Sequence, residues 1–110
     1  MRNDKAIVDV RTYTIRLRGL AEFLDVFDRL AMPVQLKYLG PPLGIFTSAV
    51  GALNQVVHLW DFDNMGEFKS RHAARDLDLD WPAYLQASAH LITAQENRLV
   101  RRVIMPSLSG

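Results

Sequence analysis

The sequence predicts an α+β domain with the element order β-α-β-β-α-β. Apolar residues recur at three- and four-residue steps in two regions, which is typical of amphipathic helices. Four other stretches are rich in β-branched and aromatic residues and are bounded by glycine, proline or polar residues, as strands are. These predicted strands cover residues 7–16, 43–50, 54–62 and 95–105. The length of 110 residues fits a single domain that spans residues 1–110.

The first predicted strand is followed by a helix with one apolar stripe. The stripe consists of Leu20, Phe23, Phe27, Leu30, Val34 and Tyr38. Pro33 interrupts this helix, and we expect it to kink the helix or to separate its last turn. Gly40, which precedes two prolines, suits a left-handed cap at the end of the helix.

The second and third predicted strands form a hairpin, because the link at Gly51 is too short for any other connection. Successive side chains of a strand point to opposite faces of the sheet. In the third strand, Val57 and Leu59 therefore share one face. The other face carries Val56, His58, Trp60 and Phe62. A histidine and a tryptophan on that face suggest the wall of a pocket.

Two helical pieces follow the hairpin. Asn64 and Glu67 resemble a capping box at the start of a helix that ends near residue 75. After a break at residues 76–79, Asp80 can cap another helix, with Pro82 tolerated in its first turn. The predicted buried stripe of that helix is Trp81, Tyr84, Leu85, Ser88, Leu91 and Ile92.

This order predicts a ferredoxin-like fold with a four-stranded antiparallel sheet of order 4-1-3-2. Both helical regions would then cover the same face of the sheet. We expect the opposite face to be uncovered within the chain and to carry Ile7, Tyr13, Val56, Trp60 and Phe62. An open face that apolar should be buried against a second copy, which predicts a homodimer whose two sheets enclose a shared cavity.

Composition excludes several classes of function. A net charge of +1 argues against a surface for nucleic acid or for an anionic membrane, and no run approaches the roughly 20 apolar residues of a membrane span. The chain has no cysteine, which removes disulfides and thiolate chemistry. Its first residues lack the apolar segment of a signal peptide. We therefore expect a cytoplasmic protein without nucleic-acid or membrane partners.

Several segments together resemble the NIPSNAP family. They are residues 11–14, 40–46, 51–60, 81–85 and 95–98, and the run Asn-Gln-Val-Val-His-Leu-Trp at 54–60 is the most specific of them. The resemblance extends over about residues 7–108. It implies a ferredoxin-like domain that dimerises into an α+β barrel, in a superfamily that includes cofactor-free monooxygenases, small lactone isomerases and haem-binding relatives. It implies no agreed biochemical activity.

The candidate site residues come from three strands. Arg11 and Tyr13 share a face of the first strand, and His58 and Trp60 share a face of the third. Asn97 would join them if the last strand flanks the first. Together they could hold an oxygenated aromatic or enolic ligand, with the arginine on an anionic oxygen, the histidine on a proton and the tryptophan stacked on a ring.

Three interpretations of these residues remain open. The first is a binding site for a small organic ligand. The second is an enzyme for cofactor-independent oxygenation or isomerisation, with His58 as proton acceptor, Arg11 as anion clamp, and Tyr13 and Trp60 as walls. The third is an interaction module whose dimer faces are its function. In that case Arg11 would pair with Asp9 or Glu96 across the dimer, and His58 would be a satisfied core residue.

Metal and cofactor sites are not expected. The three histidines lie on different elements, and we expect His72 and His90 on helix surfaces. The acidic run from Asp76 to Asp80 starts like a calcium loop, but Trp81 and Ala87 stand where such a loop needs glycine and an acid. There is no nucleophile elbow and no phosphate-binding loop. Arg98, Arg101 and Arg102 form a small basic cluster that is typical of a guarded sheet edge or an interface.

Overall fold

Four antiparallel strands form one sheet in the computed structural model of this protein, which describes residues 5–108. They are β1 (Ile7–Ile15), β2 (Gly44–Thr47), β3 (Gln55–Phe62) and β4 (Ile92–Arg101). Their order, β2-β3-β1-β4, confirms the predicted ferredoxin-like sheet. The first four residues, where no signal peptide is expected, lie outside the described part.

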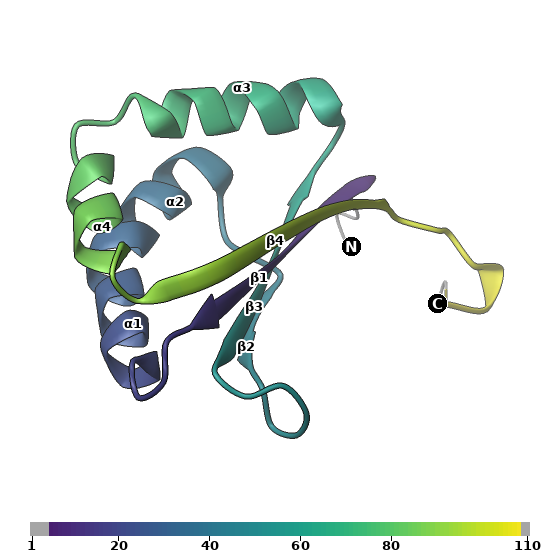
Figure 1. The fold of residues 1–110 in the computed structure, drawn as a ribbon. Helices are drawn as coiled ribbons and strands as arrows, with labels where there is room; N and C mark the ends of the chain where they lie inside the picture. Colours follow the sequence, from purple (N-terminus) through teal and green to yellow (C-terminus); the bar gives the residue numbers. More distant parts are fainter. Residues whose placement is uncertain (1–4, 109–110) are drawn as a thin grey trace.

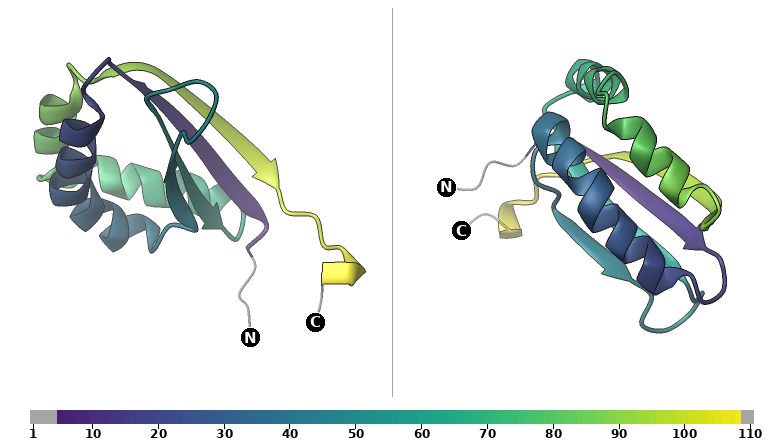
Figure 2. Two further views of the ribbon diagram at one scale, coloured as in Figure 1. Left: turned by 90° about the horizontal axis from the view of Figure 1, so that it is seen from below. Right: turned by 90° about the vertical axis from the view of Figure 1, so that its left-hand side faces the viewer.

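The helices lie on one face of this sheet, as predicted (Figure 1). They are α1 (Leu20–Val26), a π-helical turn (Phe27–Ala31), α2 (Met32–Leu39), α3 (Met65–Asp76) and α4 (Trp81–Ser88). The right-hand view of Figure 2 shows α1, α2 and α4 in front of the strands, with α3 at the top. Among the described residues, no helix combines the length and the apolar character that a membrane crossing requires.

The identity of the covered face differs from our expectation. Ile7, Tyr13, Val56, Trp60 and Phe62 do not form an open face, since all five are at least 94% buried in the helix-covered core. Alternation along a strand shows which residues share a face, but it does not show which face the helices cover. The helix stripes pack on the more aromatic face, because burial of large apolar side chains against one another is the main driving force of folding.

The uncovered face is the one that carries Val10, Thr12, Val57 and Leu59. The strand register places Thr12 opposite Val57 and Glu96, and Phe46 opposite Val57, so these side chains share a side of the sheet. Phe46 is half exposed. One face of the sheet is therefore open within the chain, as predicted, but it is more mixed in polarity than predicted.

Proline produces a π-helical turn where we expected a kink or a separated last turn. Pro33 lies in the first turn of α2, directly after the π-helical segment. The N–H of Met32 bonds to the carbonyl of Phe27, five residues earlier. A proline inside a helix cannot donate its own hydrogen bond and crowds the preceding turn, and a wider turn is one way for a helix to accommodate it.

Several element boundaries also differ. β2 is shorter than residues 43–50, and β4 begins at Ile92 because Ile92 pairs with Ile15 of β1. β4 ends at Arg101 and not at residue 105. On α4, Leu85 is half exposed although it was predicted to be buried, and on α3, His72 is buried although it was predicted to lie on the surface.

Candidate functional site

A cavity of about 130 Å³ lies between α4 and the sheet. Its walls come from β1, the end of α3, α4 and β4. The lining residues are Arg11, Tyr13, Arg75, Trp81, Tyr84, Leu85, Ser88, Ile92 and Gln95. Leu85 and Gln95 are exposed and lie where the cavity meets solvent.

The spacing of residues along α4 determines which side chains form the helical wall of the cavity. The turn before α4 is held by Asp78, whose carboxylate accepts a hydrogen bond of 2.8 Å from the backbone N–H of Asp80. α4 then places Trp81, Tyr84 and Ser88 on one side, because residues three and four apart share a helix face. Ser88 is 2% exposed, and its small side chain leaves room beside the two aromatic rings.

Arg11 is the buried cation on the sheet side of the cavity. Its Nε donates to Oδ2 of Asp9 at 2.7 Å, and its Nη2 lies 3.1 Å from Nε2 of His72. Burial by itself would lower the pKa of Arg11, but the ion pair with Asp9 outweighs burial and the pKa is raised. The structure has this ion pair within one chain, whereas the alternative interpretation expects Arg11 to pair with Asp9 or Glu96 across the dimer.

His72 fixes Arg11 in place and accepts its hydrogen bond. Its Nδ1 lies 2.8 Å from the carbonyl oxygen of Phe68, so Nδ1 carries the proton and Nε2 is free to accept. Burial lowers the pKa of His72, which keeps the ring neutral at neutral pH. The side chain of Arg11 is thus positioned from two sides, and its Nη1 is not used in these hydrogen bonds.

Arg75 provides a second cation at the end of α3. Its guanidinium lies 4.4 Å from the ring centroid of Trp81, a cation–π contact. Its Nε and Nη2 donate to Asp76, and its Nη1 donates to the side-chain oxygen of Gln35. Two arginines therefore line the cavity, and no lining residue is acidic.

The Tyr84 hydroxyl is a buried polar group without a hydrogen-bond partner among the described residues. The side chain is 3% exposed. Burial, helped by the nearby Tyr13, raises the pKa of Tyr84 above its usual value, and the neighbouring Ser88 side chain acts in the opposite direction. At neutral pH the phenol stays protonated, and its oxygen is closed off from solvent.

His58 and Trp60, two of the predicted site residues, lie behind the cavity and not in its wall. The indole Nε1 of Trp60 donates to Nδ1 of His58 at 2.8 Å. The His58 ring packs edge-on against Tyr13, at 4.7 Å between centroids, and against Phe27 at 5.3 Å. His58 supports the cavity through Tyr13 and is fully buried.

The surroundings of His58 disfavour a role as proton acceptor. Because Nδ1 accepts from Trp60, the neutral ring carries its proton on Nε2, and Nε2 has no partner among the described residues. Burial, with the nearby charge of Arg11, lowers the pKa of His58 to about 3. The ring therefore has no free lone pair for a substrate proton at neutral pH.

Asn97 lies opposite Arg11 on the neighbouring strand, as predicted, but its side chain is exposed and does not line the cavity. The predicted residues Arg11 and Tyr13 do line it. The residues that sequence reasoning missed are Arg75, Trp81, Tyr84, Ser88 and Gln95. The signal that could have found the helical ones is a stripe that carries a serine, an indole N–H and a phenol where a plain core would be aliphatic.

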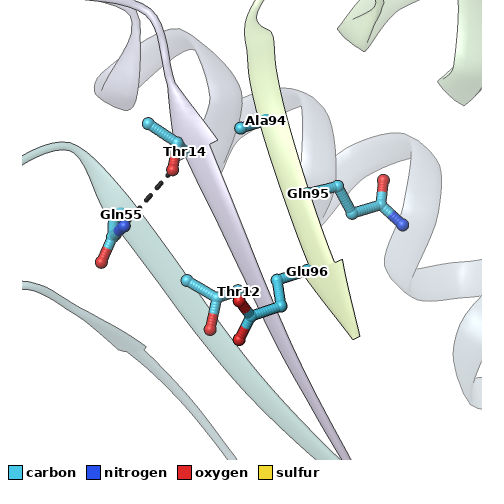
Figure 3. Close-up of a pocket in the computed structure, with 6 residues that line it drawn as sticks. All are labelled: Thr12, Thr14, Gln55, Ala94, Gln95 and Glu96. Atoms are coloured by element: carbon cyan, nitrogen blue, oxygen red, sulfur yellow. Dashed lines mark hydrogen bonds between the residues drawn. The ribbon is translucent and has the colours of Figure 1, made fainter. Parts of the chain in front are cut away.

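A separate groove of about 440 Å³ lies on the uncovered face of the sheet. It is lined by Thr12, Thr14, Gln55, Ala94, Gln95 and Glu96 (Figure 3). The amide of Gln55 donates to the Thr14 hydroxyl at 3.3 Å. In Figure 3 the side chain of Gln95 points away from Glu96, which agrees with its place in the lining of the cavity on the helix side. Across the described residues, no cluster of three or more histidine and acidic side chains could hold a metal ion.

Comparison with known proteins supports the family resemblance. The family model described as NIPSNAP matches residues 8–105. The protein NipSnap homolog of Dictyostelium discoideum is 29% identical over 104 residues, which are 94% of this chain and 44% of that protein. The chain thus spans less than half the length of this curated relative.

Solved structures share the fold. A NIPSNAP family protein of unknown function from Agrobacterium tumefaciens has 25% sequence identity and a TM-score of 0.87, with 98% of this chain and 97% of that chain covered. A putative antibiotic biosynthesis monooxygenase from Nitrosomonas europaea has 10% identity and a TM-score of 0.63, with 86% and 95% covered. At that identity the second likeness shows the fold alone.

Proposed function

Because this chain belongs to the NIPSNAP family, for which sequence implies a fold but no activity, we propose a function from the chain's own cavity: it binds a small organic ligand between α4 and the sheet. The observation that carries the proposal is the cavity itself, which is lined by Arg11 and Arg75, by three aromatic rings and by no acidic residue. A concave site with mostly apolar walls and a few polar groups is typical of small-ligand binding.

We propose that the domain works as a pair. The uncovered face carries Val10, Val57, Leu59 and Phe46 without cover from the chain itself. On the same face Glu96 and Arg98 lie two residues apart on β4, so a copy related by a two-fold axis can set opposite charges against each other.

Catalysis is the second candidate. The monooxygenase named above has the same fold, and an enolic or phenolic ligand beside Arg11 would be held as its anion. A general base must reach the proton that it removes. The cavity lining holds no histidine, aspartate or glutamate, and His58 is occupied by Trp60. These observations favour binding over turnover. They also favour a ligand site over a pure interaction module, because such a module has no need for a polar cavity.

The absence of cysteine is compatible with the reducing cytoplasm, which we propose as the compartment of this protein.

The test is a screen of single-ring organic compounds by NMR. Trp81 lines the cavity, so its indole N–H signal should shift on binding, whereas that of Trp60, which is hydrogen-bonded in the core, serves as the internal reference. Ser88→Leu should fill the cavity and abolish the Trp81 shift, and Ala89→Leu, at an exposed position next to it, should retain the shift. If no compound shifts Trp81 at millimolar concentration, or if the shifts survive in a folded Ser88→Leu protein, the proposal is wrong.

A further inference from the structure

Resting on the proposed function, we infer the class of the ligand: a planar, single-ring organic acid whose anionic group is bound by Arg11 and whose ring lies against Trp81. The acid is a carboxylate or an enolate on an unsaturated ring. The inference follows from the charges, the free donors and the dimensions of the cavity.

The charges of the lining favour an anion. Arg11 and Arg75 both line the cavity, while their partners Asp9 and Asp76 do not. Asp76 is on the solvent side, with a side chain that is 58% exposed. A ligand that enters therefore meets two guanidinium groups and no lining carboxylate. Charge-assisted hydrogen bonds from arginine to a carboxylate are about twice as strong as neutral ones.

The free donors define the recognition point. A guanidinium has five N–H groups. In Arg11 the hydrogen bonds to Asp9 and His72 use Nε and Nη2, so Nη1 is left for a ligand. The three donor nitrogens of Arg75 already bond to Asp76 and Gln35, so its remaining contribution is charge and a fixed position over Trp81. The Tyr84 hydroxyl is closed off from solvent beside Ser88, so Arg11 is the recognition point.

The dimensions favour one flat ring. The cavity measures about 130 Å³. An apolar cavity of roughly 150 Å³ in another protein takes up benzene, so a space of this size holds one ring. The rings of Trp81 and Tyr84 lie 4.9 Å apart between centroids with an angle of 41° between their planes. Aromatic walls contact a planar ring through offset or edge-on geometry. A puckered saturated ring with the same number of carbon atoms cannot match that geometry.

The experiment compares three probes of similar size: benzoate, benzamide and cyclohexanecarboxylate. The Trp81 indole shift is titrated with each. We expect benzoate to bind at least tenfold more tightly than benzamide, which has the ring without the charge. We also expect it to bind several-fold more tightly than cyclohexanecarboxylate, which has the charge without the flat ring. Benzoate affinity should fall as salt is raised, since the attraction to Arg11 and Arg75 is screened.

The outcomes separate the two proposals. If benzamide or cyclohexanecarboxylate binds as tightly as benzoate, the ligand class is wrong and the cavity still binds ligands. If none of the three probes shifts Trp81 but another single-ring compound does, the ligand class is again wrong. If no compound of any class shifts Trp81, both the ligand class and the proposed function are wrong.

Discussion

At the scale of single residues, neighbours decide what a side chain can do. His58 lies on the same face as Arg11 and Tyr13, as the alternation of the strands predicts. Its pairing with Trp60 and its complete burial convert it from a candidate base into a neutral core residue. Trp81 and Tyr84, which the helical period marks as core, instead form the aromatic wall of the cavity.

The state of His58 predicts a pH dependence of stability. In the folded protein burial lowers the pKa of His58 to about 3, whereas in the unfolded chain it is near the usual value of about 6.5. Between these two pH values the unfolded state binds one more proton than the folded state. The free energy of unfolding should therefore decrease as the pH falls from about 6.5 toward 3, by roughly 1.4 kcal/mol per pH unit from this group.

Two variants check this effect by urea unfolding at a series of pH values. His58→Asn keeps an acceptor for the Trp60 N–H. In this variant the difference in bound protons between the unfolded and the folded state should be smaller by about one. The contribution of His72, whose pKa is also lowered by burial, should remain. Gln86→Asn, at an exposed position without a titratable group, should unfold with the pH dependence of the original protein. Equal pH dependence in His58→Asn and the original protein would show that His58 is not held neutral by its surroundings.

At the scale of elements, local signals fixed most boundaries and missed specific ones. Asn64 caps α3 as predicted, since its side chain accepts from the backbone N–H of Glu67 at 2.8 Å. The second half of the capping box is not formed. The Glu67 carboxylate instead lies near Arg71 at 3.2 Å and Lys5 at 3.9 Å. A charged side chain with two cations in reach makes those contacts and leaves the backbone N–H of the cap unused.

The cap of α3 can be tested directly. Asn64→Ala should lower the free energy of unfolding by about 1 kcal/mol, because the N–H of Glu67 loses its acceptor. Asp63→Ala, one position earlier and exposed, is the control and should change it by less than about 0.5 kcal/mol. Both values come from urea unfolding at one pH. Equal effects of the two substitutions would mean that the cap does not stabilise α3.

At the scale of the whole molecule, one layer of helices covers one face of the sheet and leaves the other bare (Figure 2). The bare face combines half-buried and exposed apolar residues with Thr12, Gln55 and Glu96. A face of this kind supports the proposal that a second copy covers it, and the polar groove of Figure 3 would then lie between the two sheets.

The proposed pairing predicts the mass in solution. At micromolar concentration the protein should sediment at twice its chain mass of 12.5 kDa. Leu59→Glu, which places a charge in the middle of the uncovered face, should shift it to the monomer. Leu36→Glu is the control, because Leu36 lies on α2 and is 49% exposed on the helix side. A monomer in the original protein, or a dimer that resists Leu59→Glu, would contradict the pairing.

How much of the candidate site could be predicted varies with the kind of contact. Arg11 and Tyr13 were found because a strand alternates its side chains and the strand order places β1 in the centre. Arg75, Trp81 and Tyr84 were missed because they come from helices, whose distance from each sheet residue is not encoded in any local period. The same limit applies to His72, which reaches Arg11 over 61 positions of sequence.

The sequence alone determined the order of the elements and the antiparallel strand order, because these depend on local periodicity, turn residues and the rules of chain connection. The family followed from the resemblance of specific segments, which the family model matches over residues 8–105. Only the tertiary structure decided which face of the sheet the helices cover and which polar groups meet beneath them. That choice depends on the packing of whole surfaces, where side chains far apart in sequence compete for the same contacts. It placed His58 and Trp60 in the core and left Arg11 and Tyr84 beside an open space.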